Sequence, residues 1–375
     1  MVKPELNELK KQFTPRNCSV RRICGCYVDG DKNIKTTFSE TFLNLPEEET
    51  FKYFEIFRKT LSGTIGKNAL NLEFPNEQEE EGGTQDFLMK LRASGLTDET
   101  LLNQFYDSVI NYYDFVGNYL ILLITDAYDV PNKTTDNFVD SEMSDTVFEY
   151  IMCSICHVNL SKSGLSYNAV SNEFHTRIRD WVVELPEAGF LFPAFNDRAT
   201  DIHNCMYYMK DSEEMHEDFI TGVLGCSTTL TAKTQKAAFC ALIEQTLGDK
   251  VDYEIVQNIH ENLSEMEVEH KEKEIAEPLT LSKKEVKILF EKSGVDDEKM
   301  QVFDKLYDAS AGEKTSLYLG NVFNSRSYEV KTPDVTVKVN PERADLVETR
   351  VIDGRKCLVI PITDQVEVNG IEVTV

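Results

Sequence analysis

The chain has 375 residues, enough for two or three domains that each bury a hydrophobic core. A hydrophobic fraction of 41% and an aromatic fraction of 10% indicate a globular rather than a disordered chain. The formal net charge of −26 makes the average field repel phosphate backbones, so any nucleic-acid contact requires a local basic patch.

Cysteine usage and hydropathy indicate a compartment. Nine cysteines are scattered without a disulfide framework, in a chain long enough to be stable without disulfide bonds. This pattern is typical of reduced cytoplasmic thiols. The start, MVKPELNELKKQFTPRN, lacks the apolar core of a signal peptide. The longest apolar run, residues 119–124, is far shorter than the ~20 residues that cross a bilayer. We therefore expect a cytoplasmic protein without a membrane partner.

Helical patterns lead us to interpret residues 1–116 as a helical N-terminal part that packs on a sheet. A first apolar stripe consists of Leu6, Leu9 and Phe13. A stronger helix begins near Pro46 and ends near Gly63, with acidic residues in its first turn and basic residues in its last. Its expected buried face consists of Phe51, Phe54, Phe57 and Leu61. Asp98 is expected to cap a further helix.

Residues 117–275 are predicted to form an antiparallel sheet and the helices that follow it. NYLILLIT, FEYIMCSICHV, IRDWVVEL and GFLFPAF are apolar runs of strand length, joined by short turns that suit antiparallel pairing. We expect one sheet over roughly 118–209 with helices packed on one face. Asp211 and Glu214 suggest a capping box before the first of three following helices, and Asp252 begins the third.

Residues 282–375 are predicted to form a C-terminal α+β domain. Ser282 and Glu285 form a capping box for the first helix of a pair. Asp353-Gly354 and Asn369-Gly370 are two-residue hairpin signals in the β-rich segment that follows. The predicted fold class is therefore α+β, with a mainly antiparallel central sheet flanked by helices and a C-terminal helix-pair and β-hairpin domain.

A cluster of polar residues follows the hydrophobic segment GFLFPAF. It consists of Asp197, Arg198, Asp201 and His203. These are candidate ligand-binding residues, because carboxylates and an imidazole suit a hard or borderline metal. Asp126 or Asp129 would join them if their strand lies alongside. We favour the alternative, a structural turn with Asp–Arg pairing, since Asn and Asp stabilise bends through their own backbone.

Two groups of cysteines resemble metal or haem motifs. CSICH, residues 153–157, matches the C-x-x-C-H pattern of haem attachment, but it lies inside an apolar strand where cysteine is an ordinary core residue. Together these thiols would supply a tetrahedral zinc site from Cys18, Cys24, Cys26, Cys153 and Cys156. We favour buried structural cysteines and expect no cofactor.

A basic head occupies residues 1–26, where six basic residues accompany two acidic ones. The candidate phosphate or partner contacts in this segment are Lys10, Lys11, Arg21 and Arg22. The net charge of this segment is positive although the whole chain is acidic, and such a local positive charge suits contact with phosphates or with an acidic partner. We favour the alternative, a solvated helix face that attracts the acidic remainder of the chain.

Long sequence blocks resemble one known family. The blocks are KKQFTP, RICGCYVDG, FKYFEIFRKTLSGTIGKN, NYLILLITDAYDVP, GFLFPAFNDRATDIH, NIHENL and VIDGRKCLVIPITDQVEVNGIEV. Over nearly its full length the chain resembles an uncharacterised, largely clostridial family of Firmicutes, filed as domain of unknown function 4317. The resemblance implies a bacterial cytoplasmic protein and brings no activity, cofactor or catalytic residue. In element order alone, the chain also resembles bacterial nucleoid-associated proteins of the 37-kilodalton class.

The motifs favour interaction over catalysis. No Ser/His/Asp order, nucleophile elbow, H-E-x-x-H motif or dinucleotide fingerprint is present in the sequence. We expect a non-enzymatic protein that binds an unidentified protein partner, with nucleoid or nucleic-acid association as a sub-case. The alternative is a metal-dependent or hydrolytic enzyme centred on Asp197, Asp201 and His203. A structural dimer formed through the sheet edge is a third alternative that the sequence allows.

Overall fold

The fold is described by a computed structural model for residues 1–133, 139–140, 146–248, 251–362, 366–368 and 371–373. The chain divides into two compact units, Met1–Thr231 and Ala232–Val375. This division differs from the sequence-based one, in which the sheet and its following helices end at residue 275. Residues 1–116, expected to be helical, contribute three strands to the sheet of the first unit.

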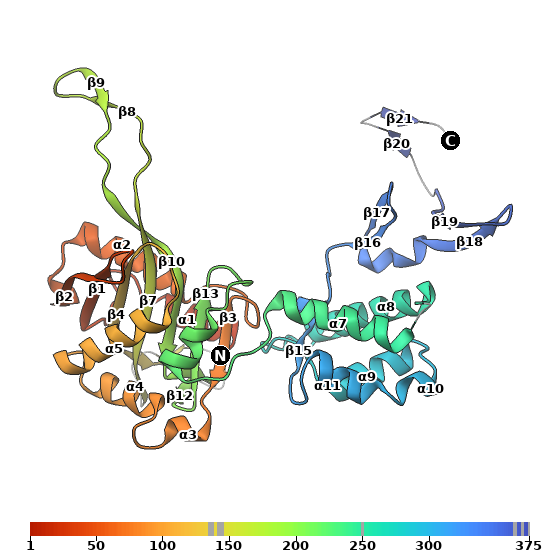
Figure 1. Ribbon diagram of the computed structural model, residues 1–375, viewed down its shortest axis with the longest axis horizontal. Coiled ribbons are helices and arrows are strands. Elements are labelled where there is room, and N and C mark those ends of the chain that lie inside the picture. Colours follow the sequence, from red (N-terminus) through yellow and green to blue (C-terminus); the bar gives the residue numbers. More distant parts are fainter. Residues whose placement is uncertain (134–138, 141–145, 249–250, 363–365, 369–370, 374–375) are drawn as a thin grey trace. The chain divides into compact units, whose positions relative to one another are not determined.

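Within the described ranges, the first unit is built on a seven-stranded sheet in which neighbouring strands run antiparallel. The strands in their order across the sheet are β2 (Ile34–Thr41), β1 (Arg22–Val28), β4 (Asn118–Val130), β7 (Thr146–Leu160), β10 (Trp181–Phe192), β13 (Asn204–Met209) and β3 (Ala69–Glu73). The predicted α+β class with a mainly antiparallel sheet is confirmed (Figure 1).

Helices cover both faces of this sheet, so the expectation of helices on one face is wrong. Ile121 and Leu123 of β4 belong to a core shared with Phe105, whereas Leu122 and Ile124 belong to the opposite core, shared with Phe57. The continuous apolar run of β4 is the physical reason. Because successive side chains point to opposite faces, a strand without polar alternation must be covered on both.

The helices of the first unit are α1 (Lys3–Lys10), α2 (Glu47–Thr60), α3 (Asn76–Glu79), α4 (Thr84–Ala93), α5 (Glu99–Tyr112) and α6 (Glu217–Phe219), with a 3₁₀ turn at Phe42–Asn44 and a π-helical turn at Ile220–Leu224. Asp98 caps α5 as predicted, because its carboxylate accepts hydrogen bonds from the backbone N–H groups of Thr100 and Leu101. In α2 the prediction of a buried Phe51 is wrong. Phe51 is 42% exposed, and Ile56 is buried instead.

The helix expected after Asp211 is shorter than predicted. The Asp211 carboxylate accepts a hydrogen bond from the Glu213 N–H, which makes a local turn, and α6 begins only at Glu217. His216 precedes α6 in a left-handed conformation with φ of 51°, and its side chain makes no cap. The predicted capping box of Asp211 and Glu214 is therefore wrong.

The β7–β10 hairpin extends beyond the sheet (Figure 1). Its far end carries the short strands β8 (Leu165–Asn168) and β9 (Glu173–Thr176), which pair only with each other among the described strands. We call residues 161–181 the arm. β8 and β9 were not predicted from the sequence.

The second unit contains the helices α7 (Ala232–Leu247), α8 (Tyr253–Glu272), α9 (Lys283–Lys292), α10 (Asp297–Met300), α11 (Phe303–Ser310) and α12 (Leu319–Val322). Ring contacts join Phe239 to Phe290 and Phe290 to Phe303 in its core. The predicted capping box of Ser282 and Glu285 is confirmed at the start of α9. The small sheet of this unit pairs β14 (Thr280–Leu281) with β15 (Leu317–Tyr318).

The described C-terminal strands pair as separate hairpins. They are β16 (Tyr328–Lys331) with β17 (Thr336–Val339), β18 (Glu348–Ile352) with β19 (Arg355–Val359), and β20 (Val366–Val368) with β21 (Ile371–Val373). The predicted Asp353-Gly354 turn is confirmed, because both residues have positive φ angles, 49° and 75°, between β18 and β19. The predicted Asn369-Gly370 turn lies outside the described residues.

Candidate functional site

The polar residues after Phe195 form a tight hairpin of their own. β11 (Ala194–Asn196) pairs with β12 (Ala199–Asp201), and Asp197 and Arg198 make the connecting turn with φ angles of 52° and 57°. Two successive positive φ angles are typical of a type I′ turn. A second turn, at Ile202 and His203, separates Asp201 from β13.

This hairpin is tied to the N-terminal helix. The Arg198 guanidinium forms a bidentate ion pair with the Glu8 carboxylate, with Nη2–Oε1 at 2.8 Å and Nε–Oε2 at 3.0 Å. Arg198 Nη2 also donates to the carbonyl oxygen of Pro131 at 2.8 Å. Both Arg198 and Glu8 are largely buried, which makes such a charge-assisted pair stronger than a surface one. Arg198 therefore serves as an anchor for α1.

The acids and the imidazole of the cluster have separate surroundings. Asp201 Oδ2 accepts hydrogen bonds from the side-chain amides of Asn196 and Asn204, at 2.6 and 2.8 Å. His203 Nδ1 lies 2.8 Å from Glu79 Oε1, and this hydrogen bond raises the pKa of His203 above its ordinary value. Asp197 is exposed at the turn. The three side chains thus face different neighbours.

Asp126 and Asp129 do not complete a site with these residues. Asp126 is buried and accepts a 2.6 Å hydrogen bond from the Tyr150 hydroxyl, whereas Asp129 is exposed. Across the described residues, no three His, Cys, Asp or Glu side chains are grouped so that they could hold a metal ion. What the arrangement does chemically is to fix backbone and helix positions.

The basic head is divided between two elements. Arg21 lies before β1 and pairs with Glu149 at 3.1 Å, while Arg22 donates to the Ser39 hydroxyl at 3.0 Å. Lys10 ends α1, and the exposed Lys11 follows it. The Arg21 side chain is 61% exposed, so its ion pair is worth little and leaves the guanidinium accessible to a partner.

The sheet divides the candidate thiol ligands. Cys24, Cys26 and Cys153 lie in the core of one face, and Cys156 lies in the core of the other. Cys18 packs against the second core as well, where burial raises its pKa to about 11. Burial likewise raises the pKa of Cys26 to about 12. Because these thiols lie on opposite faces of the sheet, they are not grouped around one position where a metal ion could bind.

A half-buried cluster around His157 escaped the sequence analysis. The Tyr113 hydroxyl lies 3.0 Å from His157 Nε2, and the Phe115 ring stacks on the imidazole with centroids 3.6 Å apart. Glu187 Oε1 lies 3.8 Å from Nδ1 and also pairs with Lys210. Burial lowers the pKa of His157 below its ordinary value. Tyr113 is fully buried, whereas the Lys210 side chain at the edge of the cluster is 47% exposed.

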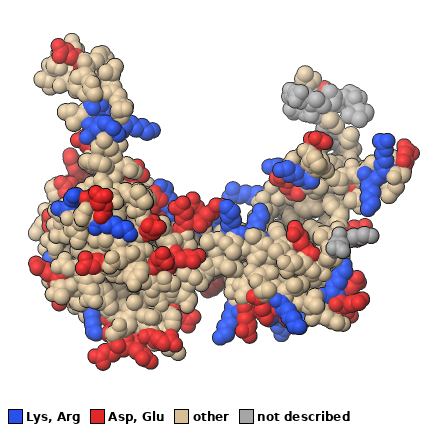
Figure 2. Space-filling view, viewed as in Figure 1, with Lys and Arg blue, Asp and Glu red and all other residues tan. Residues whose placement is uncertain are grey.

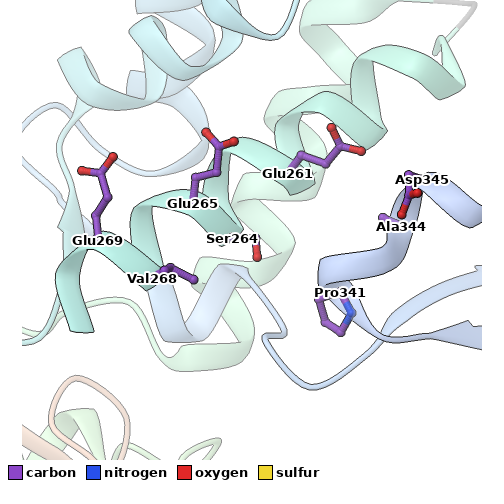
Figure 3. Close-up of a pocket in the computed structure, with 8 residues that line it drawn as sticks. All are labelled: Glu261, Ser264, Glu265, Val268, Glu269, Pro341, Ala344 and Asp345. Carbon is purple, nitrogen blue, oxygen red and sulfur yellow. The ribbon is translucent and has the colours of Figure 1, made fainter. Parts of the chain in front are cut away.

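The second unit contains an acidic groove between α8 and the turn at Pro341–Leu346 (Figure 3). Val268 and Ser264 face this turn, whereas the carboxylates of Glu265 and Glu269 point away from it. Glu261 and Asp345 also line the groove, but no three of the described carboxylates are grouped so that they could hold a metal ion.

The arm carries six exposed apolar side chains. They are Leu165, Tyr167, Val170, Phe174, Ile178 and Trp181. Val170 is 98% exposed and Phe174 is 73% exposed. Figure 2 shows the outer part of the arm as mostly tan, with a red patch at its tip and a blue patch lower down, towards the body from which it projects. Exposed apolar patches of this kind mark interaction sites.

The two faces of the arm differ in chemistry. Tyr167 pairs directly with Phe174, with ring centroids 5.3 Å apart, and Leu165 pairs with Thr176 on the same face. The opposite face carries the pairs Ser166–His175 and Asn168–Glu173. Since the side-chain period of a strand is two, this alternation is a sequence signal for one covered face. We call the face of Leu165, Tyr167, Phe174 and Thr176 the apolar arm face.

An apolar groove adjoins the base of the arm. It lies between α2 and β10 and is lined in part by Tyr53, Ile56, Leu120, Val183 and Leu185. Val183 and Leu185 are 40% and 45% exposed. The apolar surface of the arm thus continues along β10 towards the body of the unit.

By fold, the chain belongs to the class of α+β proteins in which helices cover both faces of an antiparallel sheet. None of its described helices has both the length and the apolar composition to span a bilayer. A family model described as a domain of unknown function (DUF4317) matches residues 1–371, and the chain belongs to this family. No curated protein was found to match it.

Proposed function

We propose that the chain is a non-enzymatic interaction protein of the bacterial cytoplasm that binds a protein partner through the apolar arm face. The observation that carries this proposal is the exposure of Tyr167 and Phe174 on a hairpin that projects from the sheet. Elsewhere in the unit, helices cover the apolar side chains of the long strands β4 and β7. On the arm, none of the described residues covers Tyr167 and Phe174, which are 54% and 73% exposed.

Hairpin energetics support the proposal. An isolated two-stranded hairpin is marginally stable in water, and it gains stability when its apolar face packs against another element. β8 and β9 pair only with each other among the described strands, and their apolar face is exposed. A partner that covers Leu165, Tyr167 and Phe174 would supply the burial that the hairpin lacks.

Photo-cross-linking in cells tests this proposal. A benzoylphenylalanine residue replaces Phe174 on the apolar arm face, and in a matched control it replaces His175 on the polar face. The proposal predicts a cross-linked protein product from position 174 and at least tenfold less from position 175. The absence of any cross-linked product from position 174 would overturn it.

Nucleic-acid association is the second candidate function, and the cations of the arm favour it. Lys162, Arg177 and Arg179 lie in the arm together with Trp181 and Phe174. Basic and aromatic side chains in combination suit the backbone and bases of a single strand. Lys10, Lys11, Arg21 and Arg22 would add phosphate contacts from the basic head.

Salt dependence tests the second candidate. The full chain is titrated with fluorescent single-stranded and double-stranded DNA at low and high ionic strength. Phosphate contacts require the affinity to fall steeply with salt, and Arg177→Ala reduces the slope of that dependence by roughly one. No binding at low salt contradicts this candidate and leaves the protein-partner proposal standing.

A further inference from the structure

The apolar arm face lacks charged side chains. Its two cross-strand pairs consist of Leu165, Tyr167, Phe174 and Thr176. The charged Glu173 of the same hairpin lies on the opposite face, because it pairs with Asn168. In a two-fold symmetric contact each patch meets an identical copy of itself, so a charge at its centre would face a like charge. The apolar arm face has no charged side chain at its centre, so it avoids this repulsion.

We propose that the partner of the apolar arm face is a second copy of this chain, and that two arms pack face to face about a two-fold axis. The inference rests on the proposed function, because it names the partner of the same surface. Tyr167 and Phe174 of one copy would pack against the same two residues of the other.

The area available on this face suits a weak, reversible dimer. Three of its four side chains are more than half exposed, Leu165 at 78%, Tyr167 at 54% and Phe174 at 73%. Such a face presents on the order of 500 Å², so two copies would bury roughly 1,000 Å² in total, which is the size of a weak or transient interface. The groove beside Val183 and Leu185 extends this apolar surface at the base of the arm.

The arm also reduces the electrostatic cost of pairing two acidic copies. The chain carries a net charge of −26, but residues 161–181 contain three basic and two acidic side chains. Residues 161–168 span at most about 26 Å when extended. That length exceeds the Debye length of about 8 Å at physiological ionic strength. When two arms overlap in opposite directions, they therefore keep the acidic bodies so far apart that dissolved salt screens most of the repulsion between them.

Sedimentation equilibrium of the full chain across the micromolar range tests the inference. The expected mass is twice the chain mass of 42.8 kDa. Phe174→Asp places like charges at the centre of the paired faces, so we expect it to weaken self-association at least tenfold. The matched control, His175→Asp, adds a charge on the polar face and is expected to change self-association less than twofold.

The fluorescence of Trp181 provides a second measurement of self-association, because Trp181 is the only tryptophan and lies at the base of the arm. It is 57% exposed, so pairing of the arms shifts its emission to shorter wavelength as the concentration of the chain rises. In Phe174→Asp the shift is lost. Circular dichroism of each variant verifies that the sheet is intact.

The outcomes separate this inference from the proposed function. A mass of 42.8 kDa throughout, with a cross-link from position 174 to another protein, overturns the inference and leaves the proposed function standing. The same mass without any cross-link overturns both. A dimer that Phe174→Asp and His175→Asp weaken equally also overturns the inference, because its interface would lie elsewhere. A cross-link to nucleic acid overturns the inference in favour of the second candidate function.

Discussion

The two halves of the β7–β10 hairpin both carry apolar side chains on paired strands, but these side chains are buried in the inner half and exposed in the outer half. In the inner half, Cys153, Ile155 and Phe190 are fully buried, with helices on both faces of the sheet. In the outer half, Tyr167 and Phe174 form an equivalent cross-strand pair and are mostly exposed. The difference is that helices of the same chain cover the inner half, whereas the apolar side chains of the outer half are exposed.

Packing in the inner half leaves little free space, whereas the outer half is open. A Cβ atom added at Gly189 would lie 2.4 Å from the carbonyl oxygen of Cys153 and 2.8 Å from Thr60 Cγ2. A Cβ atom added at Gly164, where the arm begins, would meet nothing within 4 Å. Matched substitutions in the two halves therefore measure how far the fold depends on each.

Phenylalanine truncation should give the largest contrast. Phe190→Ala leaves a cavity beside Phe105, whose ring centroid lies 6.1 Å away. We expect it to lower the free energy of unfolding by about 3–5 kcal/mol. Phe174→Ala on the arm is expected to change it by less than about 0.5 kcal/mol at low protein concentration, where any partner is dissociated. Urea unfolding measures both, and equal losses would contradict the contrast.

Glycine replacement should give the next largest contrast. Gly189→Ala forces the β7 backbone or the Thr60 methyl group to shift, and we expect a loss of about 1–3 kcal/mol. Gly164→Ala has open space and is expected to stay within about 0.5 kcal/mol of the parent. Thermal unfolding of the two variants compares them. A larger loss for Gly164→Ala would indicate that the arm is packed within its own chain.

Serine replacement probes the same contrast at a smaller scale. The buried Ser154 hydroxyl lies 2.6 Å from Thr60 Oγ1. Ser154→Ala removes this hydrogen bond, and we expect it to cost about 1 kcal/mol. Ser163→Ala on the exposed arm should cost nothing measurable. Denaturant midpoints compare the two, and a neutral Ser154→Ala would show that the buried hydroxyl pair does not contribute.

Acid should weaken the inner half through His157. Burial lowers its folded pKa below its unfolded value, so the unfolded chain binds the proton first as pH falls. The stability linked to neutral His157 is present above the unfolded pKa of about 6.5 and is lost as pH falls through the folded value. His157→Gln should flatten the decrease in stability between neutral and mildly acidic pH. An unchanged slope in this variant would contradict the account.

Much of the sheet was predictable because its apolar runs are long. The strands around residues 118–130 and 148–158 have the length and composition of buried strands, and the prediction found them. β2 was missed because IKTTFSET is an exposed edge strand without an apolar signal. The arm was missed because its two strands have only four residues each.

The candidate site was predictable only in part. Sequence placed Asp197 and Arg198 in a bend, as turn chemistry requires, and this is where the structure has them. The partners that fix the cluster were not predictable. Glu8 contacts Arg198 from 190 positions away, and Glu79 contacts His203 from 124 positions away. Such pairs leave no local pattern, because they depend on which elements the completed sheet brings together.

Footprinting of the arm tests most directly whether a partner covers the apolar arm face. Hydroxyl-radical labelling of Tyr167 and Phe174 is measured in cells and in the purified chain at nanomolar concentration, with exposed Tyr112 on α5 as the reference. We predict that both arm residues are labelled in the dilute chain and are protected severalfold in cells, while Tyr112 is unchanged. Equal labelling of Tyr167 and Phe174 in the two conditions would show that the face remains bare, which contradicts the proposal.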